Sequence, residues 1–416
     1  MGMEFDMNGG LLRKIRVAIL VAISATLPTK WVNLNSFFII LLVIVWLVDL
    51  TISKRRIKFN WILLLSFTSF YLLTFFSLFY TNNLDPLFSK LEIRLVILVF
   101  PLILLGSSDI DASILKLILK TFLVSCTIIS LLCFVYTFGS NYIGGNVYRF
   151  SNNWLFSSEN LVDRFGFDPN YLSLHSIFCI FIALFLFSEG ELRSWISLLL
   201  IAFLGIFQLL LASRVGILTF VVLSTLTILY EAYLRRRLLN GIIYVILFIG
   251  VVLGIGINSQ TTKDKFDALF NRNIHKYNEP FRVNRRVIQW NSAVQVFMKS
   301  PLLGVGTGDM QDELQKIYFD KKFNEGYEIQ YNPHNLFLDS AASLGLLGLI
   351  SNLLLFGISF YRSLSVKNIL YLQFLLLFFS FSLVESTFSV QKGVVFFFFF
   401  NTLFYSSLKR KQQLTN

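Results

Sequence analysis

The sequence predicts an all-α, polytopic membrane protein with about twelve membrane-spanning helices. Hydrophobic residues make up 55% of the 416 residues and charged residues only 14%, whereas soluble domains carry about 25% charged residues. Apolar runs of roughly 20 residues, the length that crosses a bilayer, recur along the chain. Short basic clusters separate these runs, and with twelve spans every cluster falls on the same side of the membrane.

The predicted spans follow the apolar runs in chain order, and the first, fourth and twelfth runs are short. They begin near Ile15, Leu34, Trp61, Ile93, Ile114, Tyr171, Trp195, Val215, Gly241, Asn335, Ile369 and Val394. Basic clusters that orient them lie at residues 14–16, 53–58, 235–237, 362–367 and 409–411.

The basic clusters predict that both termini lie in the cytoplasm. We interpret residues 1–416 as a single integral membrane domain with two sizeable outer loops, at residues 139–170 and 258–333. The second loop lies between the ninth and tenth spans and is rich in charged and aromatic residues. Amphipathic stretches such as residues 287–300 predict that it forms a small helical cap on the membrane face.

Composition also excludes several classes of protein. The net charge of +12 does not indicate nucleic-acid binding, because the basic residues sit mostly in clusters between apolar runs. The first apolar run leads straight into further spans, so no cleavable signal peptide is predicted. Cys126, Cys133 and Cys179 lie inside apolar runs, which predicts buried thiols and neither disulfides nor a metal site.

Two conspicuous short segments are interpreted as structural. The glycine-rich residues 304–308 lack the Lys and Ser/Thr of a phosphate-binding loop, so they predict a turn. The phenylalanine run at residues 396–400 predicts a lipid-facing surface.

His334 stands where a long polar stretch meets the apolar run of the tenth span. A histidine changes charge near neutral pH, so at a membrane surface it is suited to move protons. Asn335 is a good helix cap, and Gly345 and Gly348 leave room for close helix packing. The plainer alternative is an interfacial histidine. His175 is predicted to be a packed polar group, and His275 an exposed loop residue.

Four charged residues interrupt or border apolar runs near the outer face, where charge is costly and usually functional. Arg214, between the seventh and eighth spans, predicts an anion site or a tight turn with its side chain reaching the interface. Arg94 begins the fourth span and fits an interfacial anchor. Glu385 ends the eleventh span and fits a partner for an arginine. Asp168, before Pro169, is suited to cap the sixth span.

The outer loop adds Arg282, Arg285 and Arg286. Arginine binds phosphate oxygens in a bidentate manner, so these residues predict phosphate binding, with a solvated basic face as the alternative. Arg286 and Trp290 are four residues apart and share one face of a helix.

Three segments together resemble the O-antigen ligase and polymerase family of bacterial membrane proteins. They are SRVGIL at residues 213–218, RVIQWNSAVQVFMKSPLLGVGTGD at residues 286–309, and PHNLFLDSAASLGLLGL at residues 333–349. Each segment alone is weak, but their order around the large loop is fairly specific.

The resemblance implies a GT-C-like, metal-independent and cofactor-free glycosyltransferase of the bacterial inner membrane with a periplasmic active site. Its donor would be a glycan on undecaprenyl diphosphate, and its acceptor lipid A core in a ligase or another lipid-linked glycan in a polymerase. Arg214 and Arg286 would bind the diphosphate, and His334 would activate the acceptor hydroxyl. Arg282 or Arg285 is an alternative to Arg286. Candidates for a supporting role are Arg282, Arg285, Glu385, Asp168, Arg94 and Asn335.

A transporter or lipid flippase is the competing interpretation from another class. Such proteins favour repeated halves and ionisable residues near the bilayer midplane. Here the two halves do not resemble each other, and the unusual charges gather toward the outer face, which favours the enzyme. Ligase and polymerase share all three segments, and we favour the ligase slightly.

Overall fold

A computed structural model describes residues 2–53, 60–106, 110–143, 161–162, 165–258 and 285–413, and within these ranges the chain is helical, with no strand. The all-α prediction is therefore confirmed for this part of the chain. Six of its helices have the length and apolar composition needed to cross a membrane. The protein is thus a helical membrane protein, while the count of twelve spans and a GT-C-like arrangement stay predictions.

The long apolar helices begin close to the starts predicted from the sequence. The six long ones are α2 (Val32–Ser53), α3 (Trp61–Phe76) continued by η1 (Ser77–Phe79), α6 (Ala112–Ile143), α8 (Pro169–Ser188), α10 (Arg214–Leu234) and α16 (Leu336–Ser365). Shorter apolar helices are α9 (Ser194–Leu210), α11 (Leu238–Asn258) and α17 (Ile369–Ser382). The first and last predicted runs lie within α1 (Gly2–Thr26) and α18 (Gln391–Gln413).

The fourth predicted span, near Ile93, is not one continuous helix. The chain there forms α4 (Leu84–Arg94), α5 (Val96–Phe100) and a π-helical turn, η2 (Pro101–Leu105). Pro101 has no backbone N–H to donate, which interrupts the regular hydrogen bonds where α5 passes into η2. None of these pieces has the length of a span.

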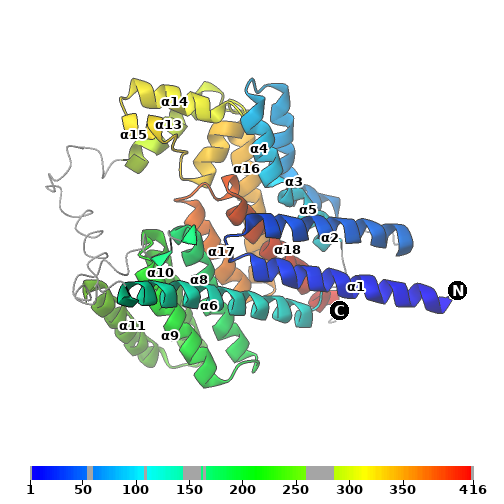
Figure 1. Cartoon of the computed structure of the whole chain (residues 1–416), viewed down its shortest axis with the longest axis vertical. Helices are drawn as coiled ribbons and strands as arrows, with labels where there is room; N and C mark the ends of the chain where they lie inside the picture. The colour runs from blue at the N-terminus through cyan, green and yellow to red at the C-terminus, as the bar shows by residue number, and fades with distance from the viewer. Residues whose placement is uncertain are drawn as a thin grey trace. The chain divides into compact units, whose positions relative to one another are not determined.

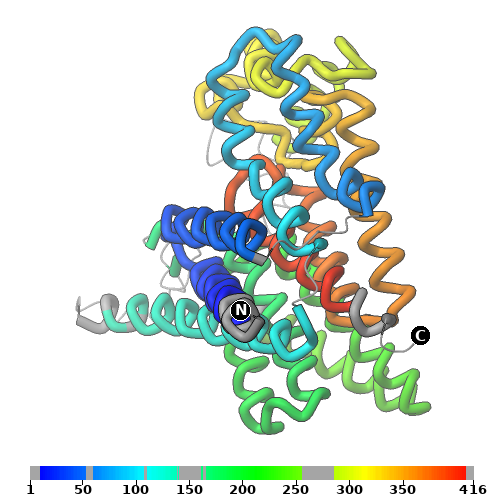
Figure 2. Tube along the Cα trace, turned by 90° about the vertical axis from the view of Figure 1, so that its right-hand side faces the viewer, coloured from blue at the N-terminus to red at the C-terminus, as the bar shows by residue number. Residues whose placement is uncertain are grey.

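Contacts divide the chain into two compact units. Unit 1 comprises Met1–Leu27, Trp31–Leu119 and Asn284–Asn416, and unit 2 comprises Pro28–Lys30 and Lys120–Val283. In unit 1, α1 and α2 lie side by side in both views (Figures 1 and 2). In unit 2, α8 packs against α9 and α10, and α10 packs against α11. The three cysteines are free and buried, as predicted.

Helix α18 forms the core of unit 1, and α4, α5, η2, α16 and α17 all contact it. The phenylalanines at residues 396–400 are fully buried, so the prediction that they face lipid is wrong. Five consecutive residues cover every side of a helix, so their burial requires neighbours all round. Aromatic rings of α17 supply part of that packing, with Phe378 4.6 Å from Phe397 between ring centroids.

Three short helices in the range predicted as the large loop pack together beside α16 (Figure 1). They are α13 (Arg285–Lys299), α14 (Met310–Asp320) and α15 (Asn324–Glu328). Val296, Leu314, Tyr318 and Phe323 form their shared apolar cluster. The amphipathic stretch at residues 287–300 lies almost wholly in α13. Residues 259–284 of this loop, with His275, and residues 144–160 of the first loop lie outside the described ranges.

The glycine-rich segment at residues 304–308 is a turn, as predicted, and it docks on a kink in α16. Gly345 at the kink has φ +65° and Gly304 in the turn has φ +72°. The backbone N–H groups of Val305 and Gly306 donate to the carbonyls of Ala342 and Ser343, at 3.1 and 3.0 Å. The interrupted helix thereby regains partners for its free carbonyls, and two backbones meet without side chains between them.

Replacing Gly345 with alanine is expected to destabilise the protein by about 2 kcal/mol or more. A Cβ there would lie 2.3 Å from the Leu302 carbonyl oxygen and 2.6 Å from the Gly304 nitrogen, and the positive φ adds strain. Thermal unfolding in detergent measures the loss. Gly357→Ala in the same helix is the matched control, because its Cβ would meet nothing within 4 Å. Equal melting temperatures for the two variants would contradict the expectation.

Candidate active site

His334 lies on the turn that leads into α16 and has an unusual backbone. Its φ is +46°, a left-handed conformation that only glycine adopts freely, and Asn332 Oδ1 accepts its backbone N–H at 2.8 Å. Asn335 caps the helix, because its Oδ1 accepts the N–H groups of Phe337 and Leu338 at 2.9 and 3.0 Å. The turn therefore holds the histidine backbone from both sides.

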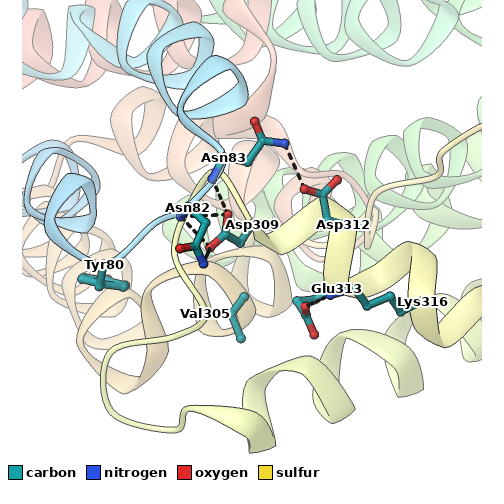
Figure 3. A pocket seen from close by; sticks show the side chains of 8 residues that line it. All are labelled: Tyr80, Asn82, Asn83, Val305, Asp309, Asp312, Glu313 and Lys316. Atoms are coloured by element: carbon teal, nitrogen blue, oxygen red, sulfur yellow. Dashed lines mark hydrogen bonds and ion pairs between the residues drawn. The ribbon is translucent and has the colours of Figure 1, made fainter.

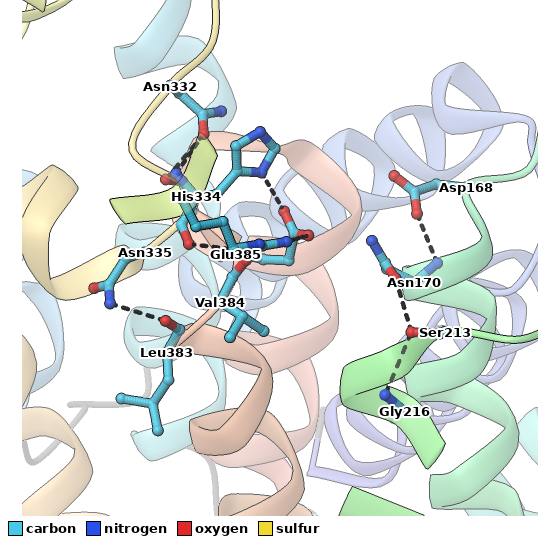
Figure 4. Close-up of polar contacts among 12 residues, drawn as sticks. Asp168, Asn170, Ser213, Gly216, Asn332, His334, Asn335, Leu383, Val384 and Glu385 are labelled. Carbon is cyan, nitrogen blue, oxygen red and sulfur yellow. Dashed lines mark hydrogen bonds and ion pairs between the residues drawn. The ribbon is translucent and has the colours of Figure 1, made fainter. Parts of the chain in front are cut away.

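Glu385 binds the ring of His334. Its Oε2 lies 2.9 Å from His334 Nδ1 (Figure 4). The Glu385 side chain is 15% exposed and that of His334 is 30% exposed. An ionised carboxylate only accepts hydrogen bonds, so Nδ1 carries the hydrogen and Nε2 is the basic nitrogen. Nε2 of this partly exposed imidazole is thus available to accept a proton.

Arg286, in the first turn of α13, completes this group. Its Nη2 lies 3.4 Å from Glu385 Oε1, and its Nη1 donates to the His334 carbonyl at 3.4 Å and to the Val384 carbonyl. The side chain is 45% exposed, so part of the guanidinium still faces outward. His334, Glu385 and Arg286 come from three segments of unit 1 and form one polar cluster.

The turn that carries Glu385, residues 383–390, is held by further contacts. Asn335 Nδ2 donates to the Leu383 carbonyl at 2.8 Å (Figure 4). Ser386 Oγ donates to Asn332 Oδ1 at 3.4 Å. Asn335 therefore serves twice, as the cap of α16 and as a clamp on the Glu385 turn.

A buried ionic network around Arg94 contacts the end of this turn. The side chains of Arg94 and Asp339 are each 1% exposed, with 3.6 Å between Nη2 and Oδ2. Arg94 Nε also donates to the Phe388 carbonyl at 3.3 Å, and Asp339 accepts from Ser389 Oγ at 2.9 Å. The expected interfacial anchor is therefore wrong, because Arg94 is enclosed by protein and ties α4 to α16.

Lys90, one turn before Arg94, adds a second positive charge to this network. Its Nζ donates to the Ser389 carbonyl at 3.2 Å. Burial lowers the pKa of Lys90, the Asp339 charge raises it, and the Arg94 charge lowers it further. Arg94 and Lys90 thus bring two positive charges near one carboxylate, and the negative charge of Asp339 offsets part of their repulsion.

The other loop arginines have different surroundings. Arg285 pairs with Glu325 at 2.6 Å, and Glu325 accepts the Tyr331 hydroxyl at 2.9 Å. The Tyr331 ring in turn packs edge-on against His334, with 6.0 Å between centroids. Arg282 lies outside the described ranges. Of the two described arginines, Arg286 is the one that contacts Glu385.

Arg214 and Asp168 belong to unit 2. Asp168 caps α8, because its Oδ1 accepts the N–H groups of Asn170 and Tyr171 at 2.7 and 3.4 Å. Ser213 caps α10 and donates to Asn170 Oδ1 at 2.8 Å (Figure 4). Arg214 is the first residue of α10, exposed, after a short turn from α9. The predicted cap at Asp168 and the predicted turn before Arg214 are present.

Elsewhere in unit 1, a cavity of about 660 Å³ is lined by Tyr80, Asn82, Asn83, Val305, Asp309, Asp312, Glu313 and Lys316 (Figure 3). Its polar groups bind one another: Asp309 accepts the backbone N–H groups of Asn82 and Asn83, at 2.9 and 2.7 Å. Hydrogen bonds from Lys299 and Lys316 hold the pKa of the Glu313 carboxyl below its ordinary value. The cavity is therefore a polar junction that joins α14 to the start of α4.

Residues 197–353 match the model of a protein family described as O-antigen ligase. The predicted family resemblance is confirmed. The matched stretch runs from α9 into α16 and contains Arg214, Arg286 and His334. Arg94 precedes this stretch and Glu385 follows it. A comparison with curated proteins finds no match. The family supports a membrane enzyme of the ligase or polymerase type that acts on lipid-linked glycans.

Sequence reasoning missed two features of this site. The sequence predicts that Glu385 pairs with an arginine, but it does not predict the contact of Glu385 with His334. Asp339 was not singled out, although an acidic residue within an apolar run is a recognisable signal. In the described part of the chain, no group of three or more His, Cys, Asp or Glu residues is arranged to hold a metal ion, and metal independence stays a prediction.

Proposed function

We propose that the protein transfers a glycan from undecaprenyl diphosphate to an acceptor sugar hydroxyl at the outer face of the bacterial inner membrane. The acceptor we favour is lipid A core, which makes the protein an O-antigen ligase. The observation that carries the proposal is the cluster of His334, Glu385 and the partly exposed Arg286, two of which lie in the stretch that matches the O-antigen ligase family model. The positive-inside pattern supports cytoplasmic termini and a periplasmic site.

In the proposed reaction, His334 Nε2 takes the proton from the acceptor hydroxyl, whose oxygen attacks the anomeric carbon of the donor. The bond between that carbon and the diphosphate oxygen breaks, and undecaprenyl diphosphate leaves with the electron pair. The guanidinium of Arg286 stabilises the charge that grows on the diphosphate. The same role for Arg214 rests on the family resemblance alone.

Arg286 is preferred to Arg285 as the diphosphate ligand because of their partners. Arg285 is engaged by Glu325 at 2.6 Å and is 28% exposed, whereas Arg286 is 3.4 Å from its carboxylate and 45% exposed. Because Arg286 is held less closely by its carboxylate and is more exposed, a phosphate group can bind its guanidinium more easily than that of Arg285.

The two acceptors are separated by incubating the purified protein with a lipid-linked glycan, with and without lipid A core. A ligase transfers glycan only when the core is present, whereas a polymerase lengthens the lipid-linked glycan without it. Failure of glycan transfer in both reactions, with folded protein in bilayer discs, would contradict the proposed function.

Arg286→Met is expected to lower the transfer rate by about 10²-fold, the usual loss when one electrostatic contact to a leaving group is removed. Arg285→Met is the matched control on the same turn of α13, and its loss is expected to be much smaller. Initial rates with saturating acceptor measure both. Equal losses of transfer rate in the two variants would show that Arg286 does not bind the diphosphate in preference to Arg285.

A further inference from the structure

Glu385 uses its two carboxylate oxygens for two different partners. Oε2 binds the His334 ring at 2.9 Å, and Oε1 binds the Arg286 guanidinium at 3.4 Å. The side chain is 15% exposed, so little water screens these interactions. One negative charge is therefore shared between the base and the diphosphate ligand of the proposed reaction.

We propose that Glu385 is a positioning residue with two opposed effects, an inference that rests on the proposed function. It holds His334 with Nε2 as the basic nitrogen and stabilises the positive charge that the ring gains in the reaction. It also occupies Arg286 until the diphosphate of the donor takes over the guanidinium.

The first effect follows from the hydrogen bond to Nδ1. A carboxylate there fixes the tautomer and the orientation of the ring, and it is the counter-ion of the imidazolium formed when Nε2 takes the hydroxyl proton. The Tyr331 ring, edge-on to His334, limits its rotation further. Loss of the carboxylate charge is expected to slow proton transfer.

The second effect follows from competition between anions for one guanidinium. The contact of Arg286 with Glu385 is long, and a diphosphate offers several oxygens for bidentate binding. The carboxylate and the phosphate repel each other at this short range, so Glu385 weakens diphosphate binding. Loss of its charge is expected to tighten that binding.

The turn around Glu385 does not depend on the carboxylate for its shape. Backbone carbonyls of Leu383 and Val384 accept hydrogen bonds from Asn335 and Arg286, and Ser386 bonds to Asn332. Glu385→Gln keeps the side-chain length and a hydrogen-bond acceptor for Nδ1–H. The substitution therefore removes charge with little change in packing.

The test compares Glu385→Gln with the unaltered full-length protein in bilayer discs. We expect kcat to fall about 10²-fold. We expect inhibition by inorganic pyrophosphate, added as a competitor of the donor, to become about fivefold stronger. Glu325→Gln is the matched control, since it removes the carboxylate that pairs with Arg285. We expect a smaller change in both quantities there.

A merely structural role would move both quantities in the unfavourable direction, because a distorted site binds pyrophosphate less well and reacts more slowly. Weaker or unchanged pyrophosphate inhibition in Glu385→Gln, or an unchanged kcat, would overturn this inference. The proposed function itself fails separately, if His334→Asn and Arg286→Met both keep the activity of the unaltered protein.

Discussion

Replacing His334 with asparagine is expected to abolish glycan transfer while the protein stays folded. The substitution removes the nitrogen proposed to accept the hydroxyl proton, and loss of a general base costs about 10² to 10⁴ in rate. Asparagine is chosen because His334 has φ +46°, and asparagine tolerates this left-handed conformation better than alanine. Initial rates of transfer from a lipid-linked glycan measure the loss.

The melting temperature of His334→Asn in detergent supplies the control for folding, and it should stay near that of the unaltered protein. His334→Ala should melt lower than His334→Asn, because alanine bears the backbone strain without compensation. Normal glycan transfer by His334→Asn would remove the histidine from the reaction.

Breaking the buried pair of Arg94 and Asp339 is expected to have the largest effect on stability. Arg94→Met leaves a carboxylate that is 1% exposed without its guanidinium, and such a loss costs about 3 to 5 kcal/mol. Asp339→Asn is expected to cost a similar amount, since it leaves Arg94 and Lys90 without their shared anion. Chemical or thermal unfolding in detergent measures both.

The matched control is Lys120→Met, which removes the cation of the pair with Glu191. That pair is shorter, at 2.7 Å, but its side chains are 39% and 34% exposed, so its loss should cost at most about 1 kcal/mol. A double variant of Arg94 and Asp339 should lose less than the sum of the two single losses. Equal losses for Arg94→Met and Lys120→Met would contradict the importance of burial.

The Arg94 network also bears on the candidate active site. Arg94 and Lys90 hold the carbonyls of Phe388 and Ser389, on the turn that carries Glu385. Arg94 therefore helps to hold the turn that carries Glu385, and its supporting role in the site stays a prediction. The sequence predicts either a supporting role for Arg94 or an anchor at the membrane surface, and its burial contradicts the anchor.

Local signals made much of this molecule predictable. A long apolar run bounded by polar residues specifies a helix wherever it lies, so the starts of helices such as α8, α10 and α17 fall near their predicted positions. Asn335 caps α16 and Asp168 caps α8 for the same reason, since a cap acts within its own turn.

The predictions that went wrong depended on which helices become neighbours. Nothing within residues 396–400 distinguishes a phenylalanine run that meets lipid from one enclosed by α4, α5, α16 and α17, because both environments are apolar. The burial of Arg94 cannot be predicted locally, because its partner, Asp339, is far away in the chain.

By itself, the sequence determined that the protein is a helical membrane protein, where its long apolar helices begin, and that its middle part resembles the O-antigen ligase family. Only the tertiary structure decided that Glu385 joins His334 to Arg286, and that Arg94 is buried against Asp339. The physical reason is one of range. An apolar run and a helix cap can be recognised from residues that are close together in the chain. The strength of a charge pair instead depends on its burial and on contacts between segments that are far apart in the chain.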